Sequence, residues 1–202
     1  TGTGKTLAFG IPLVQRLLQI PGRALIVVPT RELALQVDET IRKLGQPFNV
    51  RSVILIGGMN MSTQIQVLRK PTTRILIATP GRLLDHLEQR TAHLSDIKVV
   101  VLDEADRMLD MGFAPQIRKI AKFIPRERQT LFFSATMAPE VRDMVHSFLN
   151  SPQTISVKKR ETSVNVDQDV IHVTDNFHKM TLLHELLNKV ECKKVLIFGR
   201  TK

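Results

Sequence analysis

The sequence predicts an α/β fold in which a parallel β-sheet is covered by helices on both faces. Short runs of β-branched and other apolar residues recur along the chain, at residues 24–28, 52–56, 74–78, 98–102 and 130–133. Amphipathic segments separate these runs, and the clearest has apolar residues at helical spacing from Leu33 to Leu44 before it stops at Gly45. Strands that are apolar throughout and alternate with helices are typical of a parallel sheet buried on both faces.

A polar or glycine-bearing cluster follows each predicted strand. In chain order the clusters are PTRE (29–32), GGMN (57–60), TPGR (79–82), DEAD (103–106) and SAT (134–136). Open parallel sheets bind ligands at the edge formed by the carboxyl ends of their strands. The sequence therefore predicts that these clusters form one functional edge. By the same reasoning, the opening segment TGTGKT (1–6) is expected to follow a strand that lies before Thr1.

Residues 1–157 are predicted to form the first domain. Residues 158–168, KKRETSVNVDQ, are polar, charged and without periodicity, which is typical of a linker. Residues 169–202 then begin a strand, helix, strand series, which is interpreted as the truncated start of a second domain. This series is too short for a core of its own, because chains below about 40 residues rarely fold alone.

The charge of the chain favours a polyanionic partner. The chain has 29 Lys and Arg against 19 Asp and Glu, a formal net charge of +10, which attracts nucleic acid first and anionic membrane second. No apolar run approaches the ~20 residues that a membrane span needs, so a membrane role is excluded. Cys192 is the single cysteine, which allows no intrachain disulfide and fits a reducing compartment such as the cytoplasm.

The opening segment matches the final positions of the phosphate-binding motif G-x-x-x-x-G-K-[ST]. In such a loop backbone N–H groups surround the phosphates, Lys5 reaches the β and γ oxygens, and the Thr6 hydroxyl binds Mg²⁺. A glycine-rich turn that only starts a helix is the alternative. The motif predicts a nucleotide site formed by Thr1, Gly2, Thr3, Gly4, Lys5 and Thr6.

Acidic residues at the end of the fourth predicted strand supply the partner that a phosphate-bound Mg²⁺ requires. Asp103 follows the apolar run directly, and Glu104 can orient or deprotonate a water that attacks the γ-phosphate. The alternative is an acidic helix N-terminus, where Glu104 and Asp106 would meet the helix dipole. Because both motifs lie on strand ends of one sheet, nucleoside triphosphate hydrolysis is the stronger interpretation, with catalytic residues Lys5, Asp103 and Glu104.

Two predicted helix starts have an arginine beside a threonine. In PTRE, Thr30 precedes Arg31, and in TPGR, Thr79 and Pro80 precede Arg82; taken singly, each is ordinary capping. Together with the glycine pair of GGMN, they predict a track for successive phosphates of a nucleic-acid backbone. The chain has no Trp or Tyr for stacking on bases, so contacts should be indifferent to base sequence.

The SAT segment lies between the last predicted strand and the next helix. Thr136 is predicted to cap that helix. The hydroxyls of Ser134 and Thr136 are also expected near the acidic cluster, which would allow a coupling role. The six His residues show no metal-ligand spacing and are interpreted as surface or packing residues.

The order of these motifs, closed by LIFGRTK (196–202), resembles the DEAD-box ATP-dependent RNA helicases of superfamily 2. The segments VLDEADRMLDMGF and FFSATM are most similar to bacterial members. The resemblance implies two RecA-like domains that clamp ATP and RNA between them and separate strands locally. It also implies that Lys5 and Thr6 hold phosphates and Mg²⁺, that Asp103 holds the metal through water, and that Glu104 acts on the attacking water.

The resemblance further assigns residues to RNA and to coupling. The RNA backbone would be contacted by Thr30, Arg31, Gly58, Thr79, Gly81 and Arg82. The nucleotide site would be linked to duplex opening by Asp106, Ser134 and Thr136. ATP and Mg²⁺ are thus the implied cofactors and RNA is the implied partner.

Departures from the family pattern lead to further expectations. The adenine-reading segment and a strand before Thr1, and the arginine-bearing motifs after Lys202, are expected to be missing from a fragment. Such a fragment is expected to fold poorly and to hydrolyse ATP negligibly. The alternatives are a catalytically silent RNA-binding clamp and a DNA-stimulated RecA-like motor. A small-molecule kinase is disfavoured because it would not explain the charge of +10.

Overall fold

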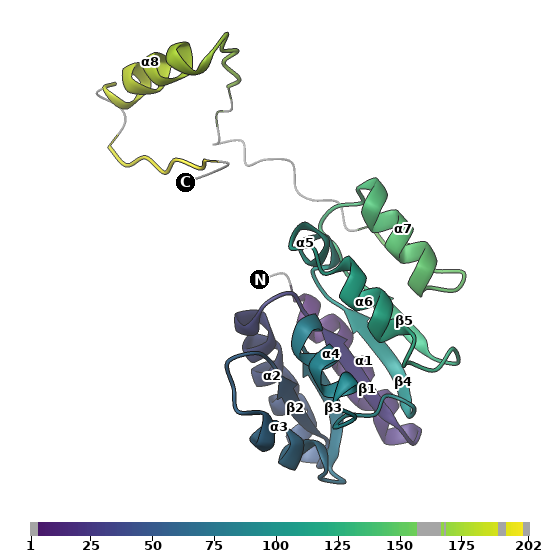
Figure 1. The fold of residues 1–202 in the computed structure, drawn as a ribbon. Helices are drawn as coiled ribbons and strands as arrows, with labels where there is room; N and C mark the ends of the chain where they lie inside the picture. Colours follow the sequence, from purple (N-terminus) through teal and green to yellow (C-terminus); the bar gives the residue numbers. More distant parts are fainter. Residues whose placement is uncertain (1–3, 157–166, 168, 190–192, 200–202) are drawn as a thin grey trace. The chain divides into compact units, whose positions relative to one another are not determined.

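The computed structural model describes residues 4–156, 167, 169–189 and 193–199 (Figure 1). The chain divides into two compact units, Thr1–Gln153 and Thr154–Lys202, and each is described by itself. Most of the predicted linker, residues 158–166 and 168, lies outside the described residues. The predicted division into domains therefore stays a prediction.

The first unit contains the predicted parallel sheet, which confirms the α/β fold class. Its strands are in the order β2-β3-β1-β4-β5, and every neighbouring pair is parallel. Each strand begins one residue before the predicted apolar run, because backbone pairing does not need an apolar side chain. The strands are β1 (Arg23–Val27), β2 (Arg51–Leu55), β3 (Thr73–Ala78), β4 (Ile97–Leu102) and β5 (Gln129–Phe132).

Helices cover both faces of this sheet (Figure 1). Successive strand residues point to opposite faces, so Leu25 and Val27 pack in one core cluster and Ala24 and Ile26 in the other. One face is covered by α1 (Lys5–Gln19) and α2 (Arg31–Gly45). The opposite face is covered by α3 (Met61–Leu68), α4 (Pro80–Glu88), α5 (Ala105–Asp110), α6 (Ala114–Ala121) and α7 (Pro139–Phe148).

The starts of the helices differ partly from the predictions. Thr30 caps α2, because its Oγ1 accepts a hydrogen bond from Leu33 N at 3.2 Å. Thr79 occupies the cap position of α4 and makes no side-chain cap bond. The prediction that Thr136 caps the next helix is wrong, since α7 begins at Pro139 with Ala138 at its cap. Proline favours the first helical position, and the Thr136 hydroxyl is bonded elsewhere.

One peptide group ties the two sides of β1 together at the carboxyl end of the sheet. The carbonyl of Val27 accepts a hydrogen bond from the N–H of Asp103 at 3.0 Å. The N–H of Val28, in the same peptide unit, donates to the carbonyl of Ala78 at 3.0 Å. The last peptide of β1 therefore fixes the end of β3 and the end of β4 in one register.

The second unit contains one helix among its described residues, α8 (Asn176–Leu187), capped by Asp175, whose Oδ1 accepts from His178 N at 2.8 Å. The strands predicted on either side of this helix are absent from the described residues 167, 169–189 and 193–199. An apolar run becomes a strand only when a neighbour pairs with it. In the whole described part of the chain, no helix is both long enough and apolar enough to cross a bilayer.

Candidate functional site

The register of the sheet brings all five strand ends to one edge. Val27 pairs with both Ala78 and Leu102, Leu102 pairs with Phe132, and Leu55 pairs with Ala78. The segments that follow therefore lie side by side in the order GGMN, TPGR, PTRE, DEAD and SAT. The residues predicted to contact RNA follow the adjacent strands β2, β3 and β1, and the acidic and coupling residues follow β4 and β5.

Asp103 is the buried acid of this edge. It is 3% exposed, and its Oδ1 accepts a hydrogen bond from Glu104 N at 3.0 Å. Burial raises the pKa of the Asp103 carboxyl, while the positive charge of Lys5 opposes that rise. The start of α1 therefore brings a positive charge near the carboxylate at the end of β4.

Lys5 and Thr6 begin α1. Gly4 precedes them with φ +73°, a left-handed conformation that favours glycine, and a Cβ added there would meet nothing within 4 Å. Both side chains are partly exposed, so they are open to a ligand. The predicted nucleotide residues Thr1, Gly2 and Thr3 lie outside the described residues.

The residue types at this point fit a magnesium ion bound together with phosphates. Thr6 contributes a hydroxyl and Asp103 a carboxylate, the hard oxygen ligands that Mg²⁺ prefers. In the described part of the chain, no group of three or more His, Cys, Asp or Glu side chains could hold a metal by itself. Mg²⁺ does not require such a cage, because it is usually held by one or two carboxylates and by substrate phosphates.

Glu104 combines an unusual backbone conformation with a local ion pair of its side chain. Its φ is 52°, which is uncommon for a residue with a side chain. Its side chain is 20% exposed and accepts a hydrogen bond from Arg107 Nη1 at 3.2 Å. Glu104 stands at the cap position of α5 and makes no side-chain cap hydrogen bond, while Asp106 lies in the first turn of that helix. A favourable interaction of these acids with the helix dipole therefore stays an alternative. Strained backbone of this kind is often found at functional sites.

Asp106 joins the DEAD and SAT segments through one carboxylate oxygen. Its Oδ2 accepts hydrogen bonds from Ala135 N at 3.2 Å, from Thr136 N at 3.1 Å and from Thr136 Oγ1 at 3.3 Å. Ser134 is turned to the same segment, because its hydroxyl donates to the carbonyl of Thr136 at 2.7 Å. The loop after β5 is therefore held to the helix that follows Glu104.

The residues on the other half of the edge also meet. Gly58 has φ +73°, and a Cβ built there would lie 2.8 Å from Arg31 Cζ, so the guanidinium of Arg31 lies against the Gly58 backbone. Arg82 donates from Nη1 to the carbonyl of Met59 at 3.0 Å. Arg31 and Arg82, both predicted to contact RNA, thus lie against the GGMN segment from two neighbouring helix starts.

Further residues, which the sequence motifs did not indicate, hold these segments. Asn60 caps α3 by accepting from Ser62 N and Thr63 N, and Arg107 pairs with Glu104. Gln64 of α3 is a buried polar residue, with 2% of its surface exposed. Its one signal in the sequence was a polar side chain four residues before the buried Leu68, on the same face of a short helix.

The fold and this edge define a RecA-like α/β domain in which a helix start with Gly4, Lys5 and Thr6 lies beside an acidic strand end. The structure is similar to that titled "Crystal structure of hypothetical ATP-dependent RNA helicase from Sulfolobus tokodaii", with a TM-score of 0.69 and 38% identity, over 76% of this chain and 44% of that chain. Residues 1–144 match the family model described as DEAD/DEAH box helicase. This chain belongs to the DEAD/DEAH box helicase family.

Curated relatives match the chain over its whole length. ATP-dependent RNA helicase CshA of Listeria monocytogenes is 43% identical over 205 residues, which are 100% of this chain and 39% of that protein. ATP-dependent rRNA helicase RRP3 of Meyerozyma guilliermondii is 44% identical over 206 residues, again 100% of this chain and 43% of that protein. The chain thus spans 39% and 43% of the length of these relatives. The resemblance to DEAD-box helicases, bacterial members included, is confirmed.

Proposed function

We propose that the protein containing this chain is an ATP-dependent RNA helicase, which binds the RNA backbone and couples ATP hydrolysis to local opening of a duplex. The observation that supports it most directly is the link from Asp106 Oδ2 to Ala135 and Thr136. This link begins at the helix that follows the acidic pair Asp103 and Glu104 and ends in the loop of the next strand. It would connect the acidic residues proposed to act on ATP with the loop that follows β5.

On the nucleotide side, each residue has a distinct task. The N–H groups at the start of α1 and the Lys5 ammonium would bind the phosphates of ATP. Thr6 and Asp103 would hold Mg²⁺, which neutralises charge on the phosphates when it is bound. Glu104 would accept a proton from, or orient, the water that attacks the γ-phosphate. To do so it would give up its ion pair with Arg107, which is partly exposed and therefore weak.

On the polymer side, we propose that Thr30, Arg31, Gly58, Thr79, Gly81 and Arg82 contact successive phosphates of RNA. Backbone N–H groups at helix starts and arginine guanidinium groups both suit phosphate oxygens. Such contacts position the polymer without reading its bases. The choice of RNA over DNA follows the names of the relatives, which are RNA and rRNA helicases. We further propose a cytoplasmic location, where an enzyme of this kind meets RNA.

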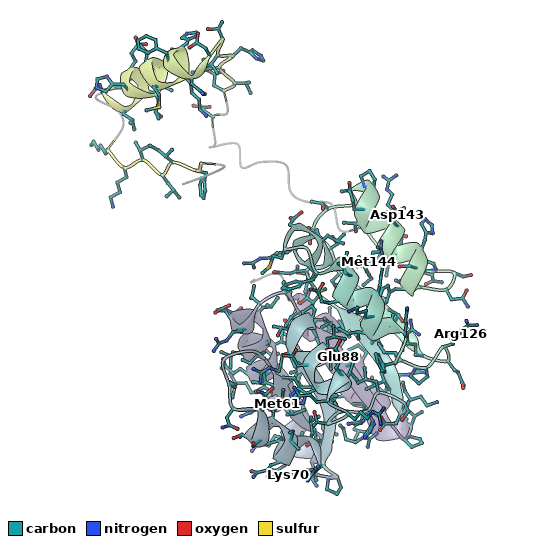
Figure 2. The ribbon with its side chains drawn as sticks, in the orientation of Figure 1. Met61, Lys70, Glu88, Arg126, Asp143 and Met144 are labelled. Atoms are coloured by element: carbon teal, nitrogen blue, oxygen red, sulfur yellow. The ribbon has the colours of Figure 1, made fainter. Side chains whose placement is uncertain are left out.

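ATP hydrolysis by the natural protein that contains this chain tests the proposal. It is measured without nucleic acid, with single-stranded RNA and with single-stranded DNA. RNA should stimulate hydrolysis, and Glu104→Gln should abolish turnover while ATP binding persists. Glu88→Gln is the matched control, because Glu88 is exposed at the end of α4, away from the DEAD segment (Figure 2).

Two outcomes would replace the proposal. Equal stimulation by DNA would make the protein a broader nucleic-acid motor. RNA binding without any hydrolysis, in a protein that binds ATP, would favour the catalytically silent clamp. Loss of activity in Glu88→Gln as large as that in Glu104→Gln would show that the effect of Glu104 is not specific.

A further inference from the structure

A chain of buried polar side chains runs behind the GGMN segment. Gln64 of α3 and His86 of α4 are 2% and 0% exposed, and His86 Nε2 lies 3.3 Å from Gln64 Oε1. On its other side, His86 Nδ1 lies 2.8 Å from the hydroxyl of Thr91. Since the Gln64 oxygen has no proton to give, His86 Nε2 carries a proton and donates it to that oxygen. The Thr91 hydroxyl also donates to the carbonyl of His86 at 3.1 Å.

The Gln64 amide uses this support to hold the backbone that follows β2. Its Oε1 accepts from Ile56 N at 3.2 Å, and its Nε2 lies 3.3 Å from the carbonyl of Ile56. The same Nε2 lies 3.2 Å from the carbonyl of Met59 and 3.4 Å from that of Asn60. One buried amide therefore contacts both ends of the segment 56–60.

The carbonyl of Met59 connects this amide to the side chain of Arg82. It accepts from Arg82 Nη1 at 3.0 Å as well as from Gln64 Nε2 at 3.2 Å. The segment between Ile56 and Met59 consists of Gly57 and Gly58, and a Cβ at Gly57 would meet nothing within 4 Å. Without side chains of its own to pack, this segment depends on hydrogen bonds from outside for a single conformation.

We propose that Gln64, oriented by His86, is a positioning residue that fixes the 56–60 segment and thereby sets the Arg82 and Arg31 guanidinium groups for the phosphates of RNA. The inference rests on the proposed function, because it assigns those arginines to RNA. Burial of these polar groups is costly unless they are all paired. Here Gln64 is paired with backbone groups of the segment, and His86 is paired with the side chains of Gln64 and Thr91.

The surroundings of the buried histidine disfavour its charged form. Burial lowers the pKa of the His86 imidazole, and the nearby charge of Arg82 lowers it further, while Asp85 acts in the opposite direction.

Gln64→Met in the natural protein tests the inference, because methionine keeps the length of the side chain and removes its hydrogen bonds. RNA binding should weaken by about tenfold, as expected when one charge-assisted contact is misplaced. ATP binding should be unchanged. In the RNA-free protein, the NMR signals of the Gly57 and Gly58 amides and of Arg82 Nε–H should shift.

Thr73→Val is the matched control for a purely structural effect. Thr73 is 3% exposed, and its hydroxyl donates at 2.7 Å to the carbonyl of Val67, in the last turn of α3. This variant also loses a buried hydrogen bond, and it should lower Tm without changing RNA affinity or the signals of the glycine pair. Thr91→Val removes only the outer end of the network and serves as a milder variant if Gln64→Met does not fold.

The RNA-free spectra decide the inference even if RNA is not the ligand. Shifts of Gly57, Gly58 and Arg82 in Gln64→Met or Thr91→Val, but not in Thr73→Val, would support positioning. Unshifted signals in the Gln64 and Thr91 variants would overturn it, as would RNA affinity within about twofold of the unmodified protein at reduced Tm. Failure of the unmodified protein to bind RNA would refute only the proposed function.

Discussion

Gly58→Ala should damage RNA binding more than it damages the fold. Gly58 has φ +73°, a conformation that costs an L-residue about 1–2 kcal/mol. A Cβ there would lie 2.8 Å from Arg31 Cζ, but the guanidinium ends a flexible side chain and can move away. The loss of stability should therefore come from the backbone alone, about 1–2 kcal/mol or roughly 2–8 °C in Tm.

Salt dependence should reveal the effect on RNA. In the proposed site Arg31 neutralises one phosphate, and each such contact adds about 0.7 to the slope of log affinity against log salt for single strands. Fluorescence anisotropy with a labelled oligoribonucleotide, between about 50 and 200 mM salt, measures affinity and slope together. Gly58→Ala should reduce the slope by about 0.7 and weaken binding at low salt by about tenfold.

Two other glycines provide the controls. Gly112 has φ +77°, and a Cβ there would meet nothing within 4 Å, so Gly112→Ala should lower Tm by a similar amount and leave RNA binding unchanged. Gly57→Ala should change little, since Gly57 also has open space and no positive φ. If Gly58→Ala lost stability but kept the affinity and salt slope of the unmodified protein, the contact between Arg31 and Gly58 would not belong to an RNA site.

Further predictions concern the acidic half of the edge. Burial raises the pKa of Asp103 above the value of about 3.9 that it has in the unfolded chain, so its contribution to stability falls as pH rises through the folded-state value. Asp103→Asn should therefore raise Tm of the nucleotide-free protein at neutral pH and abolish Mg²⁺-dependent ATP binding; a lower Tm would contradict the first part. Asp106→Ala removes the acceptor of Ala135 N, Thr136 N and Thr136 Oγ1, which should cost about 1–2 kcal/mol in denaturant unfolding. It should also reduce duplex unwinding more than ATP hydrolysis, whereas a parallel loss of both would argue against coupling.

The sequence predicted the strands and their common edge because those features depend on local patterns. Apolar runs place the strands, and the polar residue after each run, such as Asp103, must stand at its carboxyl end. The wrong cap at Thr136 has a tertiary cause, since its hydroxyl is bonded to Asp106, which lies on another element. The absence of strands from the described residues after 166 has the same kind of cause, because pairing partners are not encoded in the run itself.

The buried residues that support the site, such as Gln64 and His86, could not be predicted from one sequence. Nothing in the spacing of Gln64 and His86 along the chain shows that α3 and α4 bring them within 3.3 Å of each other. The strand order has the same origin, since β1 pairs with β3 and β4 while its chain neighbour β2 lies at the sheet edge. Long-range pairing of this kind is set by packing on both faces of the sheet.

The peptide between Val27 and Val28 limits how such a protein can move. Because its carbonyl and its N–H are bonded in opposite directions to Asp103 and Ala78, the ends of β3 and β4 cannot slide past each other without breaking hydrogen bonds in the middle of the sheet. The adjacent ends of β3, β1 and β4 therefore form a rigid unit. Motion near these ends is therefore expected in what is attached to them, namely in side chains such as Glu104 and in loops such as the one after β5.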